Sequence, residues 1–244
     1  MRIELRTVSK SYGRTRALDR VSCEIEPGQL VAVLGANGAG KSTLLRCLST
    51  VIGADKGTIL CDGQPLRRDR LDLRRRMLFL PDFPLVYGGY SVIRHLGMLF
   101  RVYEAETTGV EDRAVAVLRD LDLLPLANRP VATLSRGQAY KAALAGLLTL
   151  DPEVWLLDEP FASGMDPHGI QAFRDHATEA VRRGRTILYT TQILDVVERF
   201  ADRVMVLHEG ELRAWDTMAQ LREQGRGETD PLEHIFRQLR SESV

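Results

Sequence analysis

Long apolar stretches are scarce in this sequence of 244 residues. The longest charge-free apolar run, residues 142–150, has about half the length that a bilayer-spanning helix needs. No positively charged lead into an apolar core opens the chain, so we expect no signal peptide. Any role at a membrane is therefore expected to depend on a partner chain.

Cysteines and lysines are few as well, and the positive and negative charges balance. Cys23, Cys47 and Cys61 form no CxxC pair, a pattern typical of reduced thiols in a cytosolic protein. The formal net charge is zero, so no overall field favours nucleic acid or a membrane surface. An arginine-rich stretch, residues 67–76, is interrupted by two aspartates and is predicted to be a solvated face.

Hydrophobic periodicity divides the chain into three parts. Apolar residues alternate with polar ones over 3–8 and 21–25 and form a continuous run over 30–34, which predicts strands. Between residues 88 and 152 they recur at helical spacing, and the last third returns to alternating strands and helices with a hairpin over 203–214. This order predicts an α/β core interrupted by a helical insert.

The stretch "GANGAGKST", residues 35–43, fits the pattern G-x-x-x-x-G-K-[ST] of a phosphate-binding loop. It lies between a predicted buried strand and a predicted helix, whose N-terminus favours an anion. Lys41 can reach the β- and γ-phosphates, and Ser42 can hold Mg²⁺. The predicted nucleotide-binding residues are Gly35, Ala36, Asn37, Gly38, Ala39, Gly40, Lys41, Ser42 and Thr43.

A pair of acids follows the apolar run in "VWLLDEP", residues 154–160. By itself this is an ordinary strand that ends in two carboxylates. Beside a phosphate loop, Asp158 is a candidate for the Mg²⁺ site, and Glu159 can polarise a water toward the γ-phosphate. Glu159 is therefore the predicted catalytic base.

Several stretches together resemble the nucleotide-binding subunit of ATP-binding cassette (ABC) transporters. "LSRGQ", residues 134–138, is similar to the signature of that family, and "FASGMDP", residues 161–167, is similar to its D-loop. Tyr12 stands where the family places an aromatic ring under the adenine. The resemblance covers nearly the whole chain and implies binding of ATP with Mg²⁺, and ATP hydrolysis.

The resemblance also implies a fold: a P-loop NTPase (RecA-like) α/β core with an antiparallel β subdomain and an inserted α-helical subdomain. We expect one ABC ATPase domain over residues 1–244. Its core is expected at 1–87 and 153–222, the helical subdomain at 88–152, and a short C-terminal helical tail at 223–244.

In the family, the signature of one subunit grips the ATP bound to a second subunit in a head-to-tail dimer. The residues carried over are Ser135, Arg136, Gly137 and Gln138, with Asp166 from the D-loop. "LSRGQ" alone also fits a plain helix capped by Ser135. Asp166 before Pro167 is equally a good helix start, so its D-loop role depends on the resemblance.

Two positions depart from the family pattern. Asp82 stands at the Q-loop, where a glutamine that helps to coordinate Mg²⁺ is usual; a carboxylate can still bind Mg²⁺, so Asp82 is a predicted metal-site residue with Ser42 and Asp158. We expect this extra carboxylate to turn away from the phosphate site without metal, because a like charge at ~6 Å costs about 3 kcal/mol. Gln192 replaces the histidine of the switch. An amide can bond a γ-phosphate oxygen but cannot become cationic, which predicts slower hydrolysis.

The resemblance further implies a second ABC subunit, an integral membrane permease, and a cytoplasmic position on the inner face of the membrane. Tyr87 and Tyr90 lie where the family receives its permease, although loop aromatics tucked onto the domain fit equally well. The stretch at 85–96 and the short end of the chain favour an exporter-type subunit. Two alternatives stay open: a low-turnover partner in a heterodimer, and a non-transport ABC ATPase acting on ribosomes or DNA. The neutral charge argues against a nucleic-acid partner.

Overall fold

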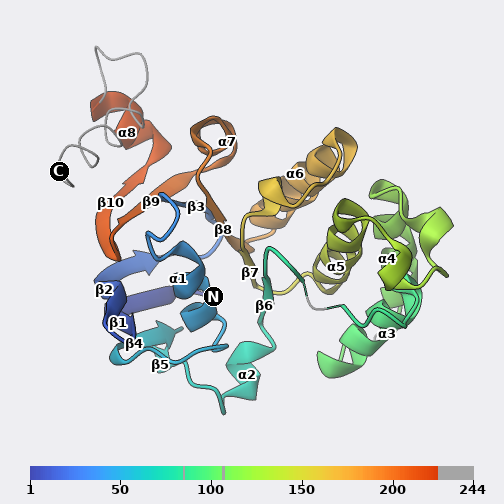
Figure 1. Cartoon of the computed structure of the whole chain (residues 1–244), viewed down its shortest axis with the longest axis horizontal. Coiled ribbons are helices and arrows are strands. Elements are labelled where there is room, and N and C mark those ends of the chain that lie inside the picture. The colour runs from blue at the N-terminus through green and yellow to red at the C-terminus, as the bar shows by residue number, and fades with distance from the viewer. Residues whose placement is uncertain (85, 106–107, 225–244) are drawn as a thin grey trace.

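The computed structural model describes residues 1–84, 86–105 and 108–224 of the chain (Figure 1). Its frame is a six-stranded sheet in the order β10-β9-β3-β8-β7-β6 and a four-stranded antiparallel sheet in the order β2-β1-β4-β5. In the larger sheet β10 runs antiparallel to β9, whereas all other neighbours are parallel. This mixed architecture agrees with the predicted α/β core and antiparallel β subdomain.

The strands are β1 (Ile3–Tyr12), β2 (Thr15–Ile25), β3 (Leu30–Leu34), β4 (Lys56–Cys61), β5 (Gln64–Pro65), β6 (Met77–Leu80), β7 (Val154–Leu157), β8 (Thr186–Thr191), β9 (Arg203–His208) and β10 (Glu211–Thr217). The α-helices are α1 (Lys41–Leu48), α2 (Leu71–Arg74), α3 (Val92–Val102), α4 (Val110–Asp120), α5 (Arg136–Leu150), α6 (Pro167–Arg182), α7 (Leu194–Phe200) and α8 (Met218–Gln224).

The central parallel strands are covered on both faces. In β3, Ala32 and Leu34 pack into a core shared with α3–α7, whereas Val31 and Val33 pack with α1 and the antiparallel sheet. Figure 1 shows these two sets of elements on opposite sides of the parallel strands. The strand sequence is continuously apolar because neither face meets water.

The helical periodicity predicted between residues 88 and 152 is confirmed by α3, α4 and α5, which lie between β6 and β7 in the chain. Helix α5 is buried along most of its length, which explains why its sequence is apolar on every side. It begins with a capping box in which Ser135 and Gln138 each bond the other's backbone N–H. The start of the signature stretch is thereby held in one conformation.

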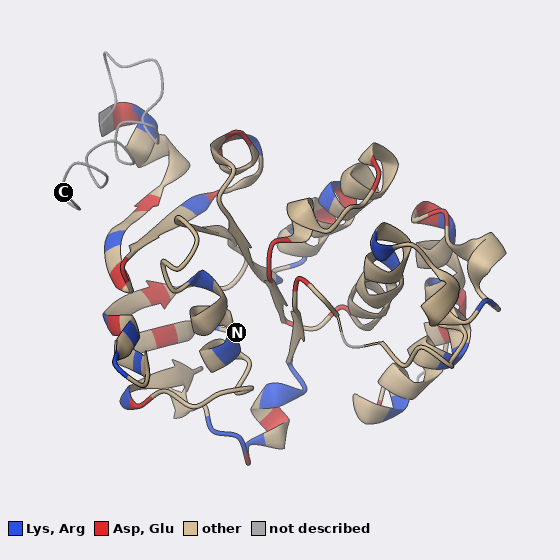
Figure 2. Cartoon of the chain, in the orientation of Figure 1, with Lys and Arg blue, Asp and Glu red and all other residues tan. Residues whose placement is uncertain are grey.

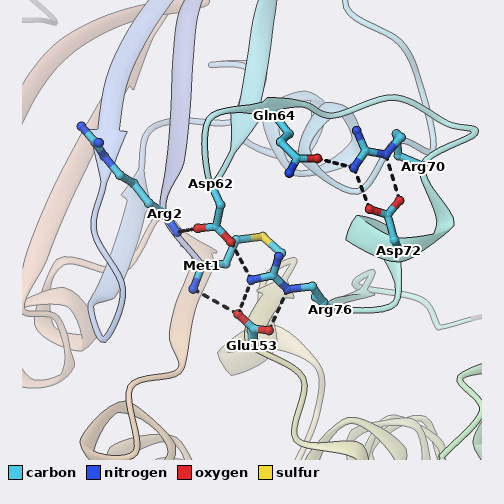
Figure 3. A network of polar contacts seen from close by, with 8 residues as sticks. All are labelled: Met1, Arg2, Asp62, Gln64, Arg70, Asp72, Arg76 and Glu153. Atoms are coloured by element: carbon cyan, nitrogen blue, oxygen red, sulfur yellow. Dashed lines mark hydrogen bonds and ion pairs between the residues drawn. The ribbon is translucent and has the colours of Figure 1, made fainter.

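A polar network joins the two sheets (Figure 3). Arg76, which precedes β6, donates to both carboxylate oxygens of Glu153 at 2.7 Å and to Asp62 at 2.6 Å. The Arg76 guanidinium lowers the pKa of Glu153 below its ordinary value of 4.5. The predicted solvated face at 67–76 is thus only partly exposed: Arg67, Arg68 and Arg75 face water, whereas Arg76 is half-buried.

Charges of both signs are interspersed along the elements (Figure 2). Helix α8 follows β10 and is described up to Gln224, so the predicted tail at 223–244 lies almost wholly outside the described residues. Within the described ranges, none of the helices has the length and apolar character needed to cross a membrane.

Candidate functional site

The phosphate-loop motif joins the carboxyl end of β3 to the N-terminus of α1. Gly40 takes a φ of 104°, and a Cβ at this position would lie 2.3 Å from the carbonyl oxygen of Ala17. Only glycine therefore fits the last turn of the loop without displacing backbone. The strand, loop and helix predicted from the sequence are all present.

Lys41 is buried against the loop that it follows, with 6% of its surface exposed. Its Nζ donates to the carbonyl oxygens of Gly35 at 2.9 Å and Ala36 at 3.1 Å, and lies 3.4 Å from Oε1 of Glu159. The ammonium is thus directed into the loop, where phosphate oxygens can replace neutral carbonyls as stronger, charged acceptors.

A chain of hydroxyl and carboxylate groups connects α1, β7 and β8. Ser42 Oγ donates to Oδ1 of Asp158 at 2.9 Å, and Thr190 Oγ1 donates to the same oxygen at 2.7 Å. Thr190 also accepts the backbone N–H of Glu159 at 2.8 Å. Thr190 was not predicted as a site residue; a buried hydroxyl near the carboxyl end of β8 was the available signal. The Ser42 hydroxyl and the Asp158 carboxylate are oxygen ligands of the kind that Mg²⁺ prefers, so they fit this ion.

Glu159 follows Asp158 and adopts a left-handed backbone conformation with φ of 47°. Such a conformation costs about 1 kcal/mol or more in a residue other than glycine and is common at functional sites. Burial raises the pKa of its carboxyl group, and the nearby Lys41 ammonium opposes this effect. A carboxylate with a raised pKa is a stronger base and is well suited to accept a proton from water.

These groups surround one cavity of about 550 Å³. The predicted site residues that line it are Tyr12, Asn37, Gly38, Ala39, Gly40, Lys41, Ser42, Thr43, Asp82, Asp158 and Glu159. Ala17, Arg46, Pro81 and Phe83 line it as well and were not predicted. Arg46 lies one helical turn after Ser42 in α1, a spacing that would have marked it as a phosphate-facing cation.

The signature and D-loop residues do not line this cavity; they pack against each other at the start of α5. A Cβ on Gly137 would lie 2.1 Å from the carbonyl oxygen of Gly164. Asp166 accepts the backbone N–H of Gly169 at 2.7 Å and the ammonium of Lys141 at 2.9 Å. Lys141, with only 4% of its side chain exposed, thus ties α5 to the start of α6.

Asp82 lines the cavity, and its Oδ1 accepts a hydrogen bond from Arg136 at 2.9 Å. Contrary to the predicted turning away, Asp82 stays at the cavity, where its charge is paired with Arg136 of the signature stretch. Gln192 is exposed just beyond the carboxyl end of β8 and is not among the residues that line the cavity. Tyr87 is 59% exposed, and Tyr90 is half-buried beneath the guanidinium of Arg94.

Comparison with known proteins agrees with this geometry. The family model described as ABC transporter matches residues 18–162. The ABC-type transporter ATP-binding protein EcsA of Bacillus subtilis is 30% identical over 242 residues, covering 99% of this chain and 98% of its own. The SkfA peptide export ATP-binding protein SkfE of the same organism is 31% identical over 210 residues, covering 86% and 87%.

Solved structures agree on the fold. A structure described as the ATP-binding subunit of an ABC transporter superposes with a TM-score of 0.91 at 28% identity, covering 98% of this chain and 99% of that one. A nucleotide-free ATP-binding cassette at 22% identity superposes with a TM-score of 0.76, which supports the fold alone. The chain has the P-loop NTPase fold and belongs to the ABC transporter family, as an ATP-binding subunit with ATPase activity that uses Mg²⁺.

Proposed function

We propose that this chain powers an exporter-type integral membrane permease by binding Mg²⁺-ATP between two ABC subunits arranged head to tail. One observation carries the proposal: the phosphate-binding residues and the signature residues lie in two separate places on the chain. The phosphate loop, Asp158 and Glu159 line the cavity, whereas Ser135 and Gly137 lie outside it at the N-terminus of α5. A signature stretch outside the cavity of its own chain is available to the nucleotide of a second chain.

Each side chain has one role in this proposal. Tyr12 stacks on the base, Lys41 and the loop N–H groups hold the phosphates, and Ser42 and Asp158 hold the metal. Glu159 accepts a proton as water attacks the γ-phosphate. Gln192 bonds the γ-phosphate in this proposal, and Gln138 and Asp166 contact the second subunit.

The permease partner places the chain on the cytoplasmic face of a membrane. The exposed ring of Tyr87, next to the start of α3, suits contact with such a partner. The relatives that support the exporter type are named for export of a peptide and of Nod factor. We infer from them the direction of transport and no particular substrate.

The test is capture of the partner by a chain that closes on ATP but does not hydrolyse it. Glu159→Gln protein with Mg²⁺-ATP should retain a multi-spanning membrane protein from solubilised membranes. Wild-type protein reconstituted with that permease should then hydrolyse ATP faster than alone. Retention of ribosomes or DNA in place of a membrane protein would favour the non-transport alternative.

A second candidate function is a low-turnover subunit paired with a more active cassette. The exposed Gln192 and the engaged Asp82 favour it, because both replace residues that normally serve turnover. ATPase of this chain alone, compared with that of a mixture containing its partner cassette, separates the two. A homodimer that hydrolyses ATP without another cassette excludes the second candidate.

A further inference from the structure

Asp82 and Arg136 lie 54 residues apart in the chain and form a contact beside the nucleotide cavity, which Asp82 lines. Asp82 follows β6, and Arg136 is the first residue of α5. Their contact is an ion pair with 2.9 Å between Nη2 of Arg136 and Oδ1 of Asp82. It therefore joins the residue at the Q-loop position to the signature stretch of the same chain.

A second contact holds the same guanidinium. It lies over the ring of Phe83, with 4.4 Å between its central carbon and the ring centroid. Two consecutive residues thus hold Arg136, one by a charge-assisted hydrogen bond and one by a cation–π contact. The side chains of Arg136 and Asp82 are 52% and 33% exposed, so water weakens the pair enough for a stronger competitor to break it.

The competitor is a divalent cation. Asp82, Asp158 and Glu159 line one cavity, in which Ser42 and Asp158 form a pair of oxygen groups suited to Mg²⁺. A metal ion at this site attracts the Asp82 carboxylate with twice the charge of a guanidinium. One carboxylate cannot satisfy both cations fully, so binding of the metal and pairing with Arg136 oppose each other.

We propose that Arg136 holds Asp82 in a latch that Mg²⁺-ATP must open, and that opening frees Arg136 for the γ-phosphate in the opposite subunit. This inference rests on the proposed head-to-tail arrangement for the second step only. The first step concerns a single chain and is measurable without a partner. Metal binding at the Q-loop position thereby changes the contacts that Arg136 makes in the signature stretch.

The latch changes the affinity for nucleotide in a definite direction. A half-exposed ion pair favours its bonded state by about fivefold, so the open state is a minority. The apparent affinity for Mg²⁺-ATP is then about fivefold weaker than that of an unlatched chain. Loss of Arg136 should therefore tighten binding, although loss of a positive charge beside a triphosphate would by itself weaken it.

The test measures dissociation constants for a non-hydrolysable ATP analogue in wild type, Arg136→Gln, Asp82→Asn and the double variant, with Mg²⁺ and with EDTA. With Mg²⁺, Arg136→Gln should bind about fivefold more tightly than wild type. In EDTA it should bind no more tightly. In the Asp82→Asn background, the second substitution should give no tightening, because the latch is already absent.

Arg113→Gln on α4 is the matched control, since it removes an exposed arginine that does not line the cavity. It should leave both constants unchanged, and thermal melts should show that all variants fold. Equal or weaker Mg²⁺-analogue binding by Arg136→Gln would overturn the latch. If wild type bound no Mg²⁺-analogue at all, the proposed function itself would fail, which is a distinguishable outcome.

Discussion

The phosphate-loop side of the site and the signature side are built differently. Lys41, Ser42 and Asp158 lie on elements of the core and bond to one another or to the loop, with Lys41 and Asp158 almost fully buried. Asp82 and Gln192 lie in loops and Arg136 lies at the first position of α5, and water reaches all three side chains. The geometry for binding phosphate is thus set by the packed core, whereas the groups on the signature side lie at the surface, where water competes for their contacts.

Glu159→Gln should produce the largest effect, and on turnover alone. Removal of a general base lowers the rate by about 10²–10⁴-fold, so hydrolysis should nearly cease. The affinity for Mg²⁺-ATP should stay within about twofold, because the amide keeps the shape of the side chain. Steady-state ATPase and equilibrium binding measure the two quantities. Glu111→Gln on α4 serves as the control, and a variant that still hydrolyses at the wild-type rate would remove Glu159 from the proposed mechanism.

Lys41→Ala tests the phosphate-loop side. A buried charge-assisted contact to phosphate contributes about 2–3 kcal/mol, so ATP affinity should fall on the order of 100-fold. Lys56→Ala, an exposed lysine at the start of β4, is the matched control and should bind as wild type does. Equal affinities of the two variants, measured by calorimetry, would contradict the assignment of Lys41.

Gly137→Ala tests how tightly the signature stretch is packed on the D-loop. The added Cβ would lie 2.1 Å from the Gly164 carbonyl oxygen, so the backbone must shift at a cost of about 1–3 kcal/mol. Gly97→Ala in α3 meets no atom within 4 Å and should stabilise the helix by about 0.5–1 kcal/mol. Urea unfolding of both variants gives the two free energies, and destabilisation of equal size would show that the close approach is not responsible.

The sequence predicted the phosphate-loop side well and the signature side only in part. The loop lies within one strand–turn–helix segment, so residues 35–43 and the pattern around them define it locally. The contacts of Arg136 with Asp82 and of Lys141 with Asp166 join residues 54 and 25 positions apart. They depend on how the helical segment packs on the core, which periodicity does not specify.

Thr190 illustrates a second reason why the sequence does not predict every residue of the site. Its hydroxyl bonds Asp158 because β7 and β8 are parallel neighbours, and the sequence alone does not give strand order. Within strand "TILYTT" the same residue is equally compatible with a position facing a helix. Side chains that act through a neighbouring strand are therefore found only once the sheet is known.

Glu153→Gln tests the polar network that joins the two sheets through Arg76. It should have a smaller, pH-dependent effect on the free energy of unfolding. The Arg76 guanidinium holds the pKa of Glu153 below its ordinary value of 4.5, so the pair stabilises the fold above that pH. The variant should lose about 1 kcal/mol at pH 7. As pH falls through the lowered pKa, wild type loses the same contribution and the difference should vanish. Unfolding free energies measured across this range check it, and a constant difference would contradict the linkage.

The most direct test of the difference between the two sides is Gln192→His, measured for binding and turnover in the same preparation. An imidazole can donate to the γ-phosphate as a cation, whereas an amide donates only as a neutral group. We predict that kcat rises on the order of threefold, less than 1 kcal/mol in the barrier, while the dissociation constant for Mg²⁺-ATP is unchanged. A variant no faster than wild type, or one whose ATP affinity changes as much as its rate, would contradict the account.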